Sequence, residues 1–381
     1  LGGVAGAIGP FVGGWLVQAA TWRLVFLINV PVAVAVIAVA VRGVPESRNP
    51  DAARSLDAIG VLTAAAGLAG LTYGFTAWPD RGGSSPAVIG ALAVGVAGIL
   101  GFILVEKHAR EPMLPLSIFR SRAFSAANLV TFAVYAALSG VLFLVVLNLQ
   151  VVVHFTALAA GISMLPVTVL MLLLSARAGA LSQRIGPRIP MTLGPIVCAC
   201  AMLLFSRIGA GSTYVRDVLP PVVVLGLGLS LTVAPLTATA LGSVDERHAG
   251  IASGVNNAVA RAAGLLAVAI LPLAAGLGGG SLTSSADLGP MYHRAMLICG
   301  GLLLVGAGIA FAAIPSKLRE PSAGAEAAAE PSVEAVQPVA LVEQIEPVRV
   351  HCAIAGTPLQ PHAPNPHTSS PHAPRSEESH R

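Results

Sequence analysis

Residues 1–20 read LGGVAGAIGPFVGGWLVQAA, an apolar block with six glycines and a single proline. A helix of about 20 residues is roughly 30 Å long, which is the thickness of the hydrocarbon core of a bilayer. Gly9 and Gly13, four residues apart, would let a neighbouring helix approach closely in lipid. Pro10 lacks a backbone N–H and predicts a bend between them. This stretch is therefore expected to form a transmembrane helix.

The rest of the chain repeats this apolar pattern. Of its 381 residues, 55% are hydrophobic and only 10% are charged, whereas about a quarter of the residues of a soluble domain are charged. Lipid offers no partner to backbone amides, and the apolar blocks do not alternate as barrel strands do. The predicted fold class is an all-α polytopic membrane protein with about ten transmembrane helices, near residues 1–20, 23–42, 57–77, 86–105, 125–150, 158–181, 189–207, 218–241, 249–276 and 293–315.

Basic side chains predict the orientation of these spans. If the first span runs outward, thirteen arginines and lysines of the loops and the tail fall on the cytoplasmic side and five outside. Loops rich in Lys and Arg stay in the cytoplasm. The three tryptophans, Trp15, Trp22 and Trp78, then lie near the outer surface, where aromatic rings anchor helices. We expect a multi-pass protein of the cell membrane with a cytoplasmic C-terminal tail.

Residues 316–381 are rich in Pro, Ala, Glu, Ser and His. Such a segment buries too little apolar surface to fold, so it predicts a disordered tail. Its irregularly spaced histidines allow a metal-binding interpretation but favour solvated low-complexity sequence. We expect no metal site, and the four cysteines lack the spacing of a disulfide framework or a zinc site. Nucleic-acid binding is not expected either, because the excess of basic residues lies in membrane loops.

Several motifs resemble one family in the same order along the chain. Gly6-x-x-Gly9-Pro10-x-x-Gly13-Gly14 resembles the antiporter motif in the fifth span of exporters of the major facilitator superfamily. The resemblance covers nearly all of residues 1–315 and points to the fourteen-span drug–proton antiporter branch. The motifs that carry it further are Trp22-Arg23 with Phe26, Asn29 and Pro31; Asp57 with Gly60; Glu111-Pro112-Met113-Leu114-Pro115; and Gly250 to Asn257 with Arg261 and Gly264.

Aligned in this way, the chain corresponds to spans 5–14 of that branch and is expected to be N-terminally truncated. The resemblance implies that the acid which takes up the proton lies in the family's first span, and so outside this chain. It also implies four parts. They are the last two helices of an N-terminal bundle at 1–42, an extra central helix pair with cytoplasmic loops at 43–122, a six-helix C-terminal bundle at 123–315, and the disordered cytoplasmic tail at 316–381.

A cytoplasmic loop carries a further motif. Gly179-x-x-x-Gln183-Arg184-x-Gly186-x-Arg188 resembles the loop motif that superfamily members repeat in each half. The acidic residue usual before the first arginine is Gln183 here, so a charge-pair latch through that position is not expected. A basic inner loop that follows only the orientation rule is the alternative interpretation.

One polar stripe lies on the predicted span 125–150. At about 100° per residue, Asn128, Thr131, Tyr135 and Ser139 fall on the same side of that helix. The resemblance implies that this side borders a central cavity. Hydrogen bonding between neighbouring helices is the alternative interpretation of the same stripe.

A second polar stripe contains Ser253, Asn257 and Arg261 in the span 249–276. By the same resemblance it also borders the cavity. Arg261 lies about 18 Å into its helix, where a cation is costly and normally faces the bundle interior or water. No Asp or Glu occurs deep in any predicted span, so the sequence indicates no partner for it. We expect a structural or coupling role for Arg261, because many exported drugs are cations that it would repel.

Together these features predict a secondary active transporter that exports amphipathic or cationic small molecules across the lipid bilayer in exchange for protons. We expect no cofactor, since a proton gradient supplies the energy, and the sequence has no nucleotide-binding loop of an ATP-driven pump. No nucleophile–base pair lies at membrane depth, so no catalytic residue is assigned and an enzyme is not expected. The alternatives are a facilitator for another metabolite, against which Gly9-Pro10 argues, and a truncated, non-transporting membrane protein.

Overall fold

A computed structural model describes residues 12, 13, 15, 16, 21, 23–43, 57–109, 112–245, 248–276, 282 and 284–316. All of them belong to one compact unit, Leu1–Pro321. The described residues form helices and turns, with no strand among them. The predicted all-α fold class is therefore confirmed, while the predicted disordered tail lies outside the described residues beyond Ser316.

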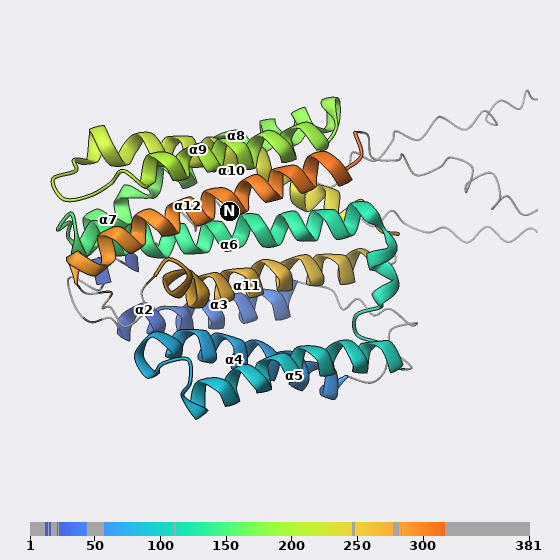
Figure 1. The fold of residues 1–381 in the computed structure, drawn as a ribbon. Coiled ribbons are helices and arrows are strands. Elements are labelled where there is room, and N and C mark those ends of the chain that lie inside the picture. The colour runs from blue at the N-terminus through green and yellow to red at the C-terminus, as the bar shows by residue number, and fades with distance from the viewer. Residues whose placement is uncertain are drawn as a thin grey trace, which may run out of the picture. The chain divides into compact units, whose positions relative to one another are not determined.

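Nine helical segments of the described chain are long and apolar enough to cross a membrane (Figure 1). They correspond to nine of the ten predicted spans. The remaining span, 1–20, lies mostly outside the described residues, and its four described residues are helical. The elements are α2 (Arg23–Leu27), α3 (Asn29–Gly43), α4 (Ala58–Arg81), α5 (Pro86–His108), the 3₁₀ turn η1 (Leu116–Arg120), α6 (Arg122–Val151), α7 (Ala157–Ser163), α8 (Leu165–Ile185), α9 (Arg188–Phe205), the π-helical turn η2 (Tyr214–Val218), α10 (Leu219–Leu241), α11 (Ala249–Ala274) and α12 (Ser285–Ala313).

Local chemistry explains where the spans begin. The Asp57 carboxylate accepts the backbone N–H of Gly60 at 2.8 Å and caps α4, as expected for an acid just before a helix. The last span starts at Ser285 rather than at the predicted residue 293. Its first turns contain Leu288, which is fully buried, so tertiary packing extends the helix beyond the continuous apolar block.

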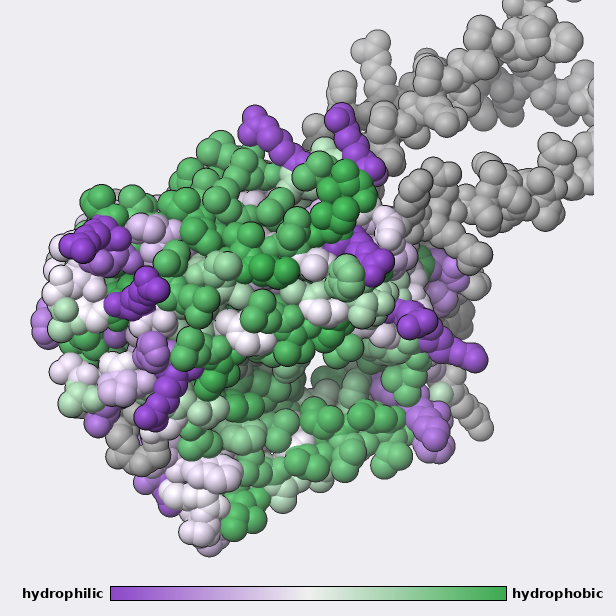
Figure 2. Space-filling model, turned by 45° about the horizontal axis from the view of Figure 1, so that its top comes forward, coloured by the Kyte–Doolittle hydropathy of each residue, from purple (hydrophilic) through white to green (hydrophobic). Residues whose placement is uncertain are grey.

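Many large apolar side chains of the described chain are exposed on its surface. No described residue of α2 or α3 is buried, and Val41 at the end of α3 is 80% exposed. Figure 2 shows hydrophobic side chains across the middle of one face, with hydrophilic ones gathered toward its ends. Such a surface is unfavourable in water by about 25 cal/mol per Å² of apolar area, whereas lipid accommodates it. The chain is built as an integral membrane protein.

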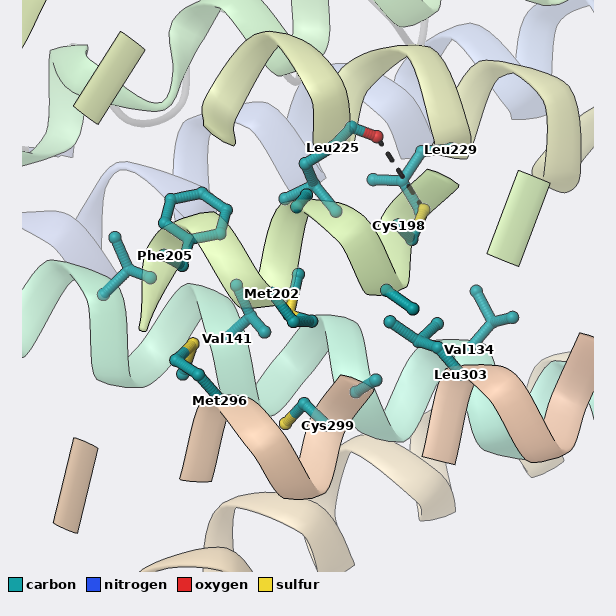
Figure 3. Packing of buried hydrophobic residues seen from close by; sticks show 14 of the residues in the cluster. Val134, Val141, Cys198, Met202, Phe205, Leu225, Leu229, Met296, Cys299 and Leu303 are labelled. Carbon is teal, nitrogen blue, oxygen red and sulfur yellow. Dashed lines mark hydrogen bonds between the residues drawn. The ribbon is translucent and has the colours of Figure 1, made fainter. Parts of the chain in front are cut away.

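The main packed core lies between α6, α9, α10 and α12. α9 packs against both α10 and α12, and α6 packs against α10, α11 and α12, while α8 covers α10. Figure 3 shows Val141 of α6, Met202 of α9 and Leu225 of α10 in one apolar cluster. Cys198 and Cys299 are buried free thiols in the same cluster. Their place agrees with a packing role rather than a bridge.

α4 and α5 form a tightly packed antiparallel pair. Gly67, Gly70 and Gly74 of α4 are buried against α5. A Cβ atom on Gly70 would lie 2.6 Å from both the Ala91 carbonyl oxygen and the Gly95 amide nitrogen. The two backbones are thus in direct contact, as small residues permit in lipid. α4 also packs against α11, which positions the pair beside the main core.

Candidate functional site

A cavity of about 650 Å³ lies between α4, α6, α10 and α11. Hydroxyl-bearing side chains line it from all four helices: Thr72 and Thr76 of α4, Tyr135 and Ser139 of α6, Thr237 of α10, and Ser253 of α11. α11 contributes the longest stretch of wall. Pockets of this size, with a few polar groups in an apolar wall, hold drug-sized molecules. The cavity is therefore the candidate site.

α11 presents its polar stripe to this cavity. Ser253, Asn257 and Arg261 follow one another at intervals of four residues, and all three line the wall. Gly264 comes next, and a Cβ atom there would lie 2.6 Å from the Ser139 Oγ of α6. The missing side chain lets the two helices approach closely. Of the seven residues predicted to border a cavity, five lie on this wall: Tyr135, Ser139, Ser253, Asn257 and Arg261.

Arg261 is the one charged side chain on the described wall. It lies twelve residues after the start of α11, or about 18 Å along the axis, and its side chain is exposed to the cavity. Its guanidinium forms no hydrogen bond or ion pair with any described residue. The described wall of the cavity therefore has a net positive charge, which comes from Arg261.

Asn128 and Thr131 do not line the cavity, which corrects the predicted stripe. Both are buried, with 4% and 0% of their surfaces exposed. Asn256 of α11 donates from Nδ2 to the Thr131 Oγ1 at 2.8 Å and to the Asn128 Oδ1 at 3.4 Å. Buried polar groups need such partners. The alternative interpretation, hydrogen bonding between helices, is therefore the one that describes these two residues.

We expect Asn256→Ala to lower the free energy of unfolding by about 2 kcal/mol, because it removes the donor that joins α11 to α6 and leaves buried acceptors unpaired. Asn257→Ala is the matched control. Among the described residues its amide donates only to the Ser253 carbonyl oxygen of its own helix, at 3.0 Å, so a change below about 0.5 kcal/mol is expected. The thermal unfolding midpoints of the two purified variants in detergent measure these two changes in stability. Equal midpoints for the two variants would contradict the role assigned to Asn256.

The family follows from comparison with known proteins. Residues 1–268 match the model of the Major Facilitator Superfamily. The chain belongs to the Major Facilitator Superfamily. It is 31% identical over 273 residues to the tetracenomycin C resistance and export protein of Streptomyces glaucescens, covering 71% of this chain and 50% of that protein. The predicted superfamily and its fold are confirmed.

Other relatives of this chain have similar names. The methylenomycin A resistance protein of Bacillus subtilis is 32% identical over 267 residues, covering 70% of this chain and 57% of that protein. The cephamycin export protein of Amycolatopsis lactamdurans is 30% identical over 297 residues, covering 77% and 61%. The chain spans about half the length of the first of these relatives and somewhat more of the others. All are named for resistance or export, and none for catalysis.

The predicted cytoplasmic loop motif, from Gly179 to Arg188, links three helices. Gly186 ends α8 with φ of +84°, which favours glycine. Arg188 opens α9, and its guanidinium lies 4.4 Å from the centroid of the Phe311 ring of α12, a cation–π contact. Gly179 lies within α8, and Arg184 is exposed in its last turn. The motif thus connects the α8–α9 turn to the end of α12, and its family role stays a prediction.

The antiporter motif lies almost entirely outside the described residues. Gly6, Gly9, Pro10 and Gly14 are not among them. Gly13 is, and it is helical, with nothing within 4 Å of a Cβ atom built on it. The role predicted for this motif therefore stays a prediction.

One buried acid was missed by the sequence motifs. The predicted span 86–105 stops just before Glu106, which is 3% exposed and is the one charged residue buried in the described chain. Its carboxylate accepts the Leu114 backbone N–H at 3.0 Å, and its Oε1 has no partner among the described residues. Val88, Gly95 and Glu106 are the buried residues of α5. Val88 and Gly95 are about two helical turns apart, and Gly95 and Glu106 about three. This spacing is the feature of the sequence that could have indicated that Glu106 is buried.

Proposed function

We propose that this chain works in a proton-coupled exporter of amphipathic small molecules, with the cavity between α4, α6, α10 and α11 as part of the substrate route. The observation that carries the proposal is the cavity itself. Its wall combines a mid-helix cation and several hydroxyl groups with apolar side chains. Relatives that are about 30% identical are named for resistance to, or export of, antibiotics.

Transport would follow the alternating-access scheme, in which bundles rock around a site near the middle of the membrane. α6 and α11 would move together in this scheme. Asn256 bonds to the Thr131 Oγ1 across their interface, and Gly264 lets the helices approach at Ser139. The cavity wall that they share would therefore keep its shape while access to it changes sides.

The energy would come from a proton gradient, without a cofactor. The carboxyl group that takes up the proton would lie outside the described cavity wall, because no residue of that wall is acidic. The partners in this proposal are protons, the exported molecule and the lipid bilayer. The protein would work in the cell membrane, with its C-terminal tail in the cytoplasm.

A transport assay tests the proposal. Inside-out vesicles are prepared from a host that lacks its own exporters and expresses the whole gene that contains the coding sequence of this chain. Three fluorescent compounds with one ring system are offered: pyrenebutyrate, pyrenebutyramide and pyrenebutylamine. At least one is expected to accumulate when the vesicle interior is acidic, and to leak out when nigericin collapses the gradient. Accumulation of none of them above the level in vesicles without the gene would contradict the proposal.

A further inference from the structure

We propose that the cavity selects amphipathic molecules that carry an anionic group, and that Arg261 binds that group. This inference rests on the proposed function and names its substrate class. It replaces the expectation of a cationic substrate, and it gives Arg261 direct contact with the substrate in place of a purely structural or coupling role. It starts from the charge of the cavity wall, on which Arg261 is the one charged residue described.

A mid-membrane cation is costly unless an anion, a carbonyl group or water compensates it. Arg261 has no hydrogen bond or ion pair with any described residue. Arg261 is nevertheless exposed, and it lines the cavity. A guanidinium presents several N–H donors in one plane, a geometry that suits a carboxylate or a sulfonate. A bound anion would supply the compensation that the wall lacks.

The groups around Arg261 also fit an anion. Tyr135, Ser139 and Ser253 line the same cavity with hydroxyl groups that have no hydrogen-bond partner among the described residues. Each hydroxyl can donate to an anionic oxygen. Hydrogen bonds to a charged group are roughly twice as strong as those between neutral groups. The wall therefore offers several donors beside its cation, and no carboxylate lies on the described wall to compete for them.

The apolar part of the wall fits the body of an amphipathic molecule. Leu265, Val268 and Ala269 follow Arg261 along α11 and line the cavity beyond it. The part of α11 up to Arg261 thus presents mainly polar side chains to the cavity, and the part after it presents apolar ones. A molecule with an anionic head and an apolar ring system would meet both at once. A cationic head would meet the Arg261 charge without a compensating acid on the described wall.

Binding of the same three pyrene compounds tests this selectivity. The purified chain is placed in nanodiscs of uncharged phosphatidylcholine, and binding to empty nanodiscs is subtracted. We expect pyrenebutyrate to bind more tightly than pyrenebutyramide, and pyrenebutylamine to bind least. Arg261→Gln is expected to weaken pyrenebutyrate binding by about 10- to 100-fold, the range for loss of a charge-assisted contact. It should leave pyrenebutyramide binding nearly unchanged, and Arg261→Lys should retain part of the preference for the anion.

The outcomes separate this inference from the proposed function. Binding of pyrenebutylamine to the unmodified chain as tight as that of pyrenebutyrate would overturn the inference alone. An equal loss for all three compounds in Arg261→Gln would also overturn it, because it would indicate a structural role. Absence of binding by all three would overturn the proposed function as well. If Arg261→Gln fails to fold, Tyr135→Phe and the order of the three affinities in the unmodified chain still decide the matter.

Discussion

Gly186→Ala is expected to destabilise the turn between α8 and α9 by about 3 kcal/mol or more. Two causes act together. Gly186 has φ of +84° and ψ of 158°, a backbone conformation that is essentially restricted to glycine. A Cβ atom at this position would also overlap the carbonyl oxygen of Ser316, just after α12. The contact between Arg188 and Phe311 lies close to both segments along the chain, so a shift of either segment is expected to strain it.

Gly179→Ala provides the matched control in the same loop motif. Gly179 lies within α8, and the nearest atom to a Cβ built there is the Ala234 Cβ at 4.0 Å. Alanine favours a helix over glycine by up to about 1 kcal/mol, so this variant should be as stable as the unmodified chain or more so. Thermal midpoints in detergent compare the two. A Gly186→Ala variant as stable as Gly179→Ala would contradict the strain assigned to this turn.

Gly70→Leu is expected to separate α4 from α5 and to lower the free energy of unfolding by about 3 kcal/mol or more. The added side chain would have to enter a space in which its first carbon already lies 2.6 Å from two backbone atoms of α5. Backbone atoms cannot rotate away as a flexible side chain would. The whole of α5 must therefore shift, and the close packing of the pair is lost.

Gly90→Leu on α5 is the control for this change. Gly90 is exposed, and nothing lies within 4 Å of a Cβ built on it. The added leucine there should face lipid with little effect. Size-exclusion profiles and thermal midpoints of both variants measure the difference. Similar destabilisation by both leucines would show that the glycine contact between α4 and α5 does not hold the pair together.

The spans of this chain were predictable because apolar blocks and caps are local properties. Asp57 caps α4 through the Gly60 amide three residues away, and the apolar block that follows continues the helix. The start of α12 was not predictable in this way. Its first turns are packed by contacts with distant parts of the chain, which bury Leu288 among residues of other helices.

The cavity was predictable only in part. The helical period places Tyr135 and Ser139 on the same side of α6 as Asn128 and Thr131, but it does not say where a facing helix covers that side. The structure shows that Asn256 of α11 covers the first part of the stripe and leaves the second part open. Asn256 and Asn257 both line the cavity and differ by about 100° around α11, so Asn256 is buried against α6 at the edge of the wall while Asn257 is exposed.

Glu106 shows a different limit of sequence reasoning. Its burial depends on a chain reversal that brings the Leu114 amide back onto its carboxylate across eight residues. Leu114 in turn packs on a small apolar cluster that contains Ile118, Phe124 and Ala252. A local pattern of hydrophobicity carries no information about such a return. The contact is visible only once α5, η1, α6 and α11 are placed together.

The central claim is that exported molecules pass through the cavity between α4, α6, α10 and α11. The most direct test repeats the vesicle assay with Ser253→Cys, a position on the cavity wall, after Cys200 and Cys352 are replaced by serine. A bulky maleimide attached at this position should abolish gradient-driven accumulation. The same label on Ser84→Cys, at an exposed position in the α4–α5 turn, should leave accumulation unchanged. Continued accumulation with a fully labelled cysteine at position 253 would contradict the claim.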